Sequence, residues 1–148
     1  MDLHAQGRMA ADLSECPDCL CLASRQAARR ITRAFDRQLR PHGLRITQFS
    51  ILVMLILAGP LTIGELADRL GIERTTLSRN LALIESAAWI TIRPGDDARS
   101  RLVSVTGKGR AVVSASLGAW RRAQAAVAAV IGPSGVDALR TLSRSQFG

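Results

Sequence analysis

The fold is decided by residues 61–85, which read LTIGELADRLGIERTTLSRNLALIE. Residues 61–70 predict a short amphipathic helix that Thr62 caps, with Glu65 at the capping-box position three residues later. Gly71 follows as a turn residue, and residues 72–85 predict a second helix. Four apolar side chains of this second helix are expected to face the core: Ile72, Leu77, Leu81 and Ile84. Two helices around a glycine turn are typical of a helix-turn-helix.

The outer face of the second helix carries short polar and guanidinium side chains. They are Arg74, Thr75, Thr76, Ser78, Arg79 and Asn80. Arginine can read guanine, asparagine can read adenine, and serine or threonine can bond to bases or phosphates. The alternative is that these side chains form the hydrated face of an ordinary helix. We predict that they enter the major groove of duplex DNA.

A hairpin is predicted directly after the helix-turn-helix. Residues 89–93 and 101–106 are rich in β-forming side chains and flank a Pro/Gly/Asp loop. In this position a hairpin is a wing, and its tip carries Arg99 and Arg101, whose charge suits a narrow minor groove. Asp97 is expected to hold Arg99 by a charge-assisted bond. The alternative is a solvated turn with an incidental ion pair.

The flanking segments predict further helices. Residues 22–45 have helical spacing that Pro41 and Gly43 end, and a core helix is expected to start after Thr47 as its N-cap. An Ala/Val-rich stretch in 109–148 is broken by Gly132-Pro133.

The predicted fold is therefore mainly α with a small β-wing. A winged helix-turn-helix core, residues 46–108, is flanked by dimerisation helices at 22–45 and 109–148. These segments form one domain, 22–148, after a flexible tail at 1–21. The alternative for the flanking helices is a helical layer within one chain.

Charge points to a nucleic-acid partner. The chain has 148 residues and a net charge of +8, and its pI near 11.3 is typical of nucleic-acid binding. With no Tyr and 3% aromatic residues, it has few stacking platforms, which favours double-stranded DNA over RNA or single strands. A solvated basic surface is the alternative.

The longest apolar run, residues 49–61, is shorter than the roughly 20 residues of a membrane span. No secretory signal is recognised at the start, so we expect a cytoplasmic protein without a membrane partner.

Catalytic motifs are missing from the sequence. The two histidines, His4 and His42, belong to no HExxH motif, no nucleophile elbow occurs, and residues 107–109 lack the rest of a phosphate loop. We therefore expect a protein that is not an enzyme.

Three motifs in register resemble the MarR family of transcriptional regulators (multiple antibiotic resistance regulators), over about residues 22–145. They are LRITQF (44–49), LADRLG (66–71) leading to LSR (77–79), and DAR (97–99) leading to VSVTGKG (103–109). The resemblance implies a homodimer on a palindromic operator, with Arg99 as the wing arginine and Asp97 as its buttress. It also implies repression that a small phenolic or other aromatic acid, or cysteine oxidation, relieves. Such proteins usually have glycine before the first wing strand, whereas this chain has Ala87-Ala88-Trp89. The second helix of the helix-turn-helix, residues 72–85, is expected to end differently from theirs, because a left-handed backbone is unfavourable for alanine.

Three cysteines ahead of the first helix form the pattern C-x2-C-x-C: Cys16, Cys19 and Cys21. Thiolates are preferred ligands of zinc and iron–sulfur clusters, although three are one short of the usual four. The candidates for a fourth ligand are His4, Asp12, Glu15 or a residue of a second subunit. Three interpretations stay open: a zinc or iron–sulfur site, a thiol redox switch, or a functionally silent cluster.

The function expected from these observations is that of a sequence-specific, homodimeric repressor that binds double-stranded DNA and responds to a redox or metal signal through the cysteines. One alternative is a repressor released by a small aromatic ligand, with a silent cysteine cluster. A non-specific architectural DNA binder and a protein-interaction winged helix are the others.

Overall fold

The computed structural model describes residue 9 and residues 13–97 and 99–146. The chain divides into two compact units, residues 1–33 and 34–148. The first unit contains the 3-10 turn η1 (Cys16–Asp18) and most of helix α2 (Leu20–Leu39). The sequence predicts a flexible tail up to residue 21, whereas α2 begins at Leu20. Good helix formers occupy its first turn, which the bond from the Ala23 N–H to the Cys19 carbonyl closes at 3.0 Å.

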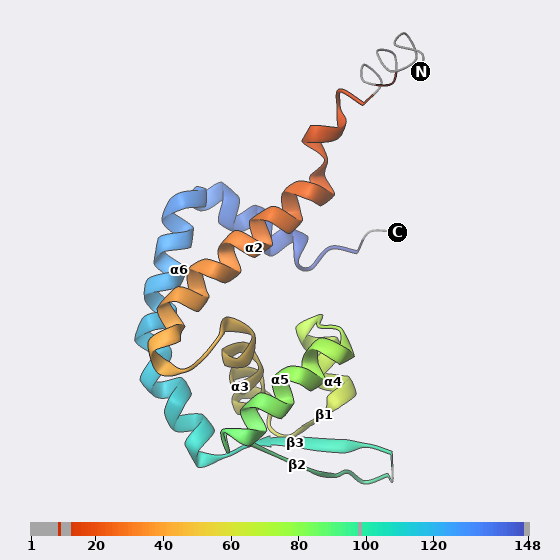
Figure 1. Cartoon of the computed structure of the whole chain (residues 1–148), viewed down its shortest axis with the longest axis vertical. Helices are drawn as coiled ribbons and strands as arrows, with labels where there is room; N and C mark the ends of the chain where they lie inside the picture. The colour runs from red at the N-terminus through yellow and green to blue at the C-terminus, as the bar shows by residue number, and fades with distance from the viewer. Residues whose placement is uncertain (1–8, 10–12, 98, 147–148) are drawn as a thin grey trace, which may run out of the picture. The chain divides into compact units, whose positions relative to one another are not determined.

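The second unit contains the end of α2 and all the remaining elements (Figure 1). In chain order these are η2 (Arg40–His42), α3 (Ile46–Ala58), β1 (Leu61–Thr62), α4 (Ile63–Leu70), α5 (Arg74–Ser86), β2 (Ile90–Pro94), β3 (Arg101–Val105) and α6 (Gly107–Leu142). The predicted class, mainly helical with a small wing, is confirmed.

Helix α3 begins one residue after Arg45, so the prediction that Thr47 is its N-cap is wrong. The reason lies partly outside the local sequence. Asp36 in α2 accepts a hydrogen bond from the Ile46 N–H at 2.8 Å, and the Gln48 side chain accepts one from the Arg45 N–H at 3.0 Å. These two bonds satisfy backbone donors that a helix start would otherwise leave free.

The sheet has three strands, in the order β1-β3-β2, and both pairs are antiparallel. Strands β2 and β3 form the predicted hairpin, with Ile92 opposite Val103. The sequence did not reveal β1, which adds Leu61 opposite Val103 on the other edge of β3. A two-residue strand has no periodicity of its own, so only its partner defines it.

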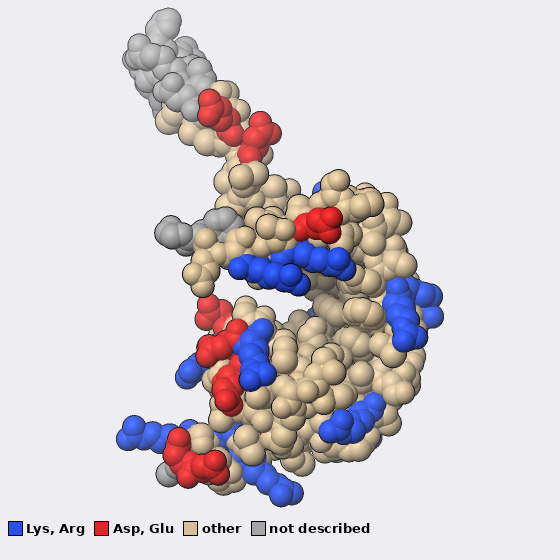
Figure 2. All heavy atoms as spheres, turned by 180° about the vertical axis from the view of Figure 1, so that it is seen from behind, with Lys and Arg blue, Asp and Glu red and all other residues tan. Residues whose placement is uncertain are grey.

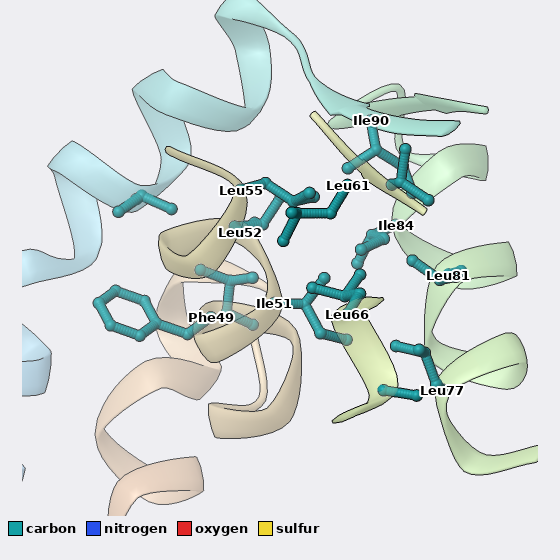
Figure 3. Packing of buried hydrophobic residues seen from close by; sticks show 14 of the residues in the cluster. Phe49, Ile51, Leu52, Leu55, Leu61, Leu66, Leu77, Leu81, Ile84 and Ile90 are labelled. Atoms are coloured by element: carbon teal, nitrogen blue, oxygen red, sulfur yellow. The ribbon is translucent and has the colours of Figure 1, made fainter. Parts of the chain in front are cut away.

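One apolar core joins the helices to the sheet (Figure 3). Its buried members include Ile51, Leu52 and Leu55 of α3, Leu66 of α4, Leu77, Leu81 and Ile84 of α5, Ile90 of β2 and Val103 of β3. Each of these side chains is at most 2% exposed. Burial on this scale contributes roughly 1.5–3 kcal/mol per large side chain and fixes the positions of α4, α5 and the wing.

Helix α6 begins at Gly107 and packs against α3 with its first half. Phe49 of α3 and Trp120 of α6 stack there, with ring centroids 6.2 Å apart. The predicted break at Gly132-Pro133 is confirmed, because Gly132 has φ 69° and a non-helical backbone inside the long helix.

Candidate DNA interface

The helix-turn-helix is held at its first helix by a reciprocal cap. The Glu65 N–H donates to Thr62 Oγ1 at 3.2 Å, and the Thr62 N–H and hydroxyl each donate to Glu65 Oε2 at 2.8 Å. These bonds, the backbone one first, lower the pKa of Glu65 below its usual value of 4.5. The predicted capping box is confirmed, and it fixes where α4 begins.

The turn after α4 is the predicted glycine turn. Gly71 has φ 60°, and its N–H donates to the Asp68 carbonyl at 3.3 Å. The Ile72 N–H donates to the Ala67 carbonyl at 3.1 Å. This pair of bonds is a Schellman motif, which redirects the chain into α5.

Helix α5 has two contrasting faces. Leu77, Leu81 and Ile84 are buried in the core, as predicted, and Ile72 just ahead of the helix is half-buried against it. The opposite face exposes most of the residues predicted to contact DNA: Arg74, Thr75, Thr76, Ser78 and Arg79. Because the buried face is locked by packing, the exposed face is presented in a fixed orientation.

Two residues predicted on this face have contacts of their own within the protein. Asn80 is half-buried, and its side-chain amide donates to the Thr76 carbonyl at 2.9 Å within α5. The Arg74 guanidinium lies over Gly64 of α4, where a Cβ would be 3.4 Å from Nη2. Thr75, Thr76, Ser78 and Arg79 are therefore the side chains most available to a groove.

Asp97 binds backbone amides of the wing loop. Asp97 Oδ1 accepts hydrogen bonds from the backbone N–H groups of Arg99 and Ser100, at 2.8 and 2.6 Å. The Gly95 N–H closes the loop by donating to the Ser100 carbonyl at 2.8 Å. Asp97 therefore has a backbone role in the loop that the sequence analysis did not predict, as is common for Asp in turns. The bond from Asp97 to the Arg99 guanidinium stays a prediction. Arg99, whose N–H is held by Asp97, is exposed.

The strand register separates the wing's basic side chains onto two faces. Arg101 is opposite Pro94, in the same row as Val103 opposite Ile92, so it extends the core-facing row. Arg93 is opposite Leu102 and extends the other row. Arg93 is exposed, and the sequence analysis missed it as a candidate, although strand alternation within residues 90–94 could have found it.

The wing carries charged side chains of both signs. Basic side chains project at the wing end of the molecule on either side of an acidic group (Figure 2). The exposed arginines of the wing strands and tip are Arg93, Arg99 and Arg101, and the acidic residues between them are Asp96 and Asp97. Projecting guanidinium groups of this kind are suited to phosphates and to a narrow minor groove.

The cysteines lie in the first unit, in three different local environments. Cys16 is in η1, Cys19 follows it, and Cys21 is in the first turn of α2; all three are exposed. Among the described residues no group of three or more His, Cys, Asp or Glu side chains is placed to hold a metal ion. Of the candidate fourth ligands, Glu15 is exposed, while His4 and Asp12 lie outside the described residues.

A helix-turn-helix followed by an arginine-bearing wing defines a winged helix-turn-helix protein of the DNA-binding class. Residues 42–100 match the model of the MarR family. The chain is 41% identical to the Mycobacterium tuberculosis transcriptional regulator MosR in a crystal structure with DNA, with a TM-score of 0.75 over 84% of this chain and 92% of that one. The chain belongs to the MarR family.

Two other relatives agree with this assignment. The repressor CouR, solved with a 23-mer DNA duplex, is 26% identical, with a TM-score of 0.74 over 88% of this chain and 93% of that one. An uncharacterized HTH-type regulator of Bacillus subtilis, YwoH, is 37% identical over 81 residues. That match spans 55% of this chain and 59% of YwoH. This chain is therefore a DNA-binding transcriptional regulator, and its family is not one of enzymes.

Proposed function

We propose that the protein is a homodimeric repressor that binds a palindromic operator in double-stranded DNA and works in the cytoplasm. The observation that carries this proposal is the two-faced α5, whose core side is locked while its outer side exposes Thr75, Thr76, Ser78 and Arg79. The DNA-bound structures of MosR and CouR support it by similarity.

The residues divide into two roles on the DNA. The outer face of α5 enters the major groove, where Arg79 has the reach and the paired donors to read a guanine. Arg99, raised by the Asp97 turn, enters the minor groove beside it, where the narrow groove concentrates negative potential. Arg93 and Arg101, on opposite faces of the wing, contact different phosphates.

The second half of α6 supports a dimer. Val130 is 86% exposed, and Leu139 and Leu142 are also exposed. By length and composition alone this 36-residue helix is apolar enough to cross a membrane. In a DNA-binding regulator, an exposed apolar helix of this kind is better explained by burial against a second copy of the chain. A dimer would place two recognition helices on a two-fold-symmetric site.

The test of this proposal is a binding titration against an operator selected from random DNA and against a shuffled duplex of the same composition. We expect a specific site to bind about 10³-fold or more tightly than the shuffled one. Arg79→Ala should lose about 5- to 100-fold on the selected site. Arg37→Ala is the matched control, because it removes the same charge from an exposed residue of α2.

A steep salt dependence of binding with no preference for the selected site would instead indicate an architectural DNA binder. Failure to bind any DNA would indicate a protein-interaction module.

The cysteine segment is the proposed sensor, and oxidation of its thiols is the proposed signal. Cys16 and Cys19 are one turn apart, with the Cys19 N–H donating to the Cys16 carbonyl at 3.2 Å, and both are exposed to an oxidant. A hydroperoxide would convert one thiol to a sulfenic acid and release water or an alcohol. A second thiol would then displace water from that sulfenic acid to form a disulfide. A metal or iron–sulfur cluster would require the segment to rearrange so that the thiolates converge.

Both chemistries are tested on protein purified without oxygen. We expect no visible absorption and no stoichiometric iron, zinc or sulfide. One equivalent of hydrogen peroxide should then remove two hydrogen atoms in the mass spectrum and weaken operator binding. Cys19→Ser should bind the operator normally and respond less to peroxide. Coloured protein with iron and sulfide would replace the redox proposal with a cluster. An unchanged peroxide response in Cys19→Ser and in the triple serine variant would leave the cysteines silent and favour a small aromatic effector.

A further inference from the structure

Helix α5, which is the proposed recognition helix, both wing strands and α6 meet at one residue, Thr106. It follows β3 and is the N-cap of α6. Its N–H donates to the Trp89 carbonyl at 3.0 Å, and its hydroxyl donates to the Ala88 carbonyl at 2.8 Å. The same hydroxyl oxygen accepts the Gly109 N–H at 3.0 Å. One side chain therefore links the start of α6 to the end of α5.

The carbonyl that accepts the Thr106 hydroxyl belongs to the residue that ends α5. Ala88 has φ 59°, and its N–H donates to the Glu85 carbonyl at 2.8 Å. The Trp89 N–H donates to the Ile84 carbonyl at 3.0 Å, which completes a Schellman motif. A non-glycine residue rarely adopts this backbone, so contacts elsewhere must hold it there. The Thr106 bond is such a contact.

The other side of the junction is a close backbone contact. A Cβ at Gly109 would lie 2.2 Å from the Trp89 carbonyl oxygen and 3.0 Å from its carbon, so the first turn of α6 rests directly on the chain that leaves α5. Beyond Gly109, the residues Val113, Ser116 and Ala119 are buried along α6. The direction of α6 is thereby coupled to that of α5 by this backbone contact as well as by the Thr106 side chain.

We propose that Thr106 is a positioning residue for operator binding, which sets the direction of the recognition helix relative to α6 without touching DNA. This inference rests on the proposed function. If α6 carries the contact with a second copy of the chain, then the angle at Thr106 sets the distance between the two recognition helices. That distance must match the spacing of the operator half-sites, one helical turn or a multiple of it.

The experiment compares Thr106→Val, Thr106→Asp, Thr106→Ser and Ser116→Ala on operators whose half-site spacing is native, one base pair shorter or one base pair longer. Valine keeps the shape of threonine and removes both hydroxyl bonds. Aspartate still accepts the Gly109 N–H as a good N-cap but cannot donate to the Ala88 carbonyl at neutral pH, so it keeps α6 capped. Serine keeps both bonds. Ser116→Ala is the matched control, because the Ser116 hydroxyl bonds only to the carbonyls of Val112 and Val113 in its own helix.

Thr106→Val and Thr106→Asp should each lose about 2- to 10-fold in affinity at the native spacing, as expected for the loss of one hydrogen bond that holds the end of α5. They should also discriminate less between the three spacings, a readout that added charge or general destabilisation does not move. Thr106→Ser and Ser116→Ala should keep the wild-type spacing profile. The inference is overturned if folded Thr106→Val or Thr106→Asp keeps that profile, or if Ser116→Ala flattens it equally. The proposed function fails separately, if the wild type prefers no operator over shuffled DNA.

Discussion

The two ends of the helix-turn-helix turn the chain in the same way with different residues. After α4 the left-handed position of the Schellman motif is Gly71, and after α5 it is Ala88, with φ values of 60° and 59°. Glycine adopts this backbone freely, while alanine does so at a cost of roughly 1–2 kcal/mol. The first turn is therefore specified by its own residue. The second is held by its neighbours, through the Thr106 hydrogen bond and the backbone contact at Gly109, and so depends on the tertiary structure.

The strongest challenge to the second turn is Gly109→Ala. The added Cβ would collide with backbone atoms of Trp89, which cannot move aside as a flexible side chain could. We expect the free energy of unfolding to fall by about 2–3 kcal/mol, measured by urea denaturation. Gly107→Ala is the control, since a Cβ there meets nothing within 4 Å. A loss equal in the two variants would show that the contact with Trp89 does not constrain α6.

The first turn is tested by Gly71→Ala. Nothing lies within 4 Å of a Cβ at this position, so the substitution adds backbone strain without a steric clash. The expected loss is about 1 kcal/mol, the left-handed penalty less the entropy that alanine removes from the unfolded chain. A lowered denaturation midpoint with an unchanged slope would give this value. No loss at all would mean that Gly71 is not required for the turn.

The opposite substitution, Ala88→Gly, should stabilise the protein. Removing the left-handed strain contributes up to about 1 kcal/mol after the entropy of the more flexible unfolded chain is subtracted. Thermal denaturation measures the gain. The double variant Gly71→Ala/Ala88→Gly should come close to the wild-type stability, because the two turns are independent sites. A destabilised Ala88→Gly would show that the alanine side chain contributes packing that outweighs the strain.

The smallest effect concerns pH and the cap that begins α4. The pKa of Glu65 is lowered in the folded protein by its bonds from Thr62. This carboxylate therefore stabilises the fold at pH values above its usual pKa of 4.5. That contribution is lost as the pH falls from about 4.5 through the lowered folded value. Glu65→Gln should abolish this component of the acid sensitivity and leave the rest. Identical stability–pH curves for the two proteins would exclude it.

The sequence predicted those elements whose defining signal lies in their own residues or in close neighbours along the chain. The Thr62/Glu65 cap, the Gly71 turn, the buried face of α5 and the break at Gly132 all follow from short-range rules, and the structure has each of them. The N-cap of α3 did not follow, because Asp36, ten residues earlier, supplies the acceptor for Ile46. Strand β1 did not follow either, since two residues are a strand only when β3 pairs with them.

The candidate DNA interface also has some features that the sequence predicted and others that only the structure revealed. The sequence predicted that Thr75, Thr76, Ser78 and Arg79 are available to DNA, because helical periodicity leaves them outside the face that the buried leucines occupy. It could not place Asp97, whose carboxylate binds loop amides, or show that Asn80 bonds to its own helix. Such bonds depend on distances of a fraction of an ångström, which residue spacing does not define.

The sequence by itself determined the class of this protein, because hydrophobic period, caps and turn residues act over a few neighbouring positions and agree with one another. Only the tertiary structure decided how the recognition helix ends. The left-handed Ala88 is unfavourable locally and persists because Thr106 and the backbone contact at Gly109, about twenty residues away, hold it in place.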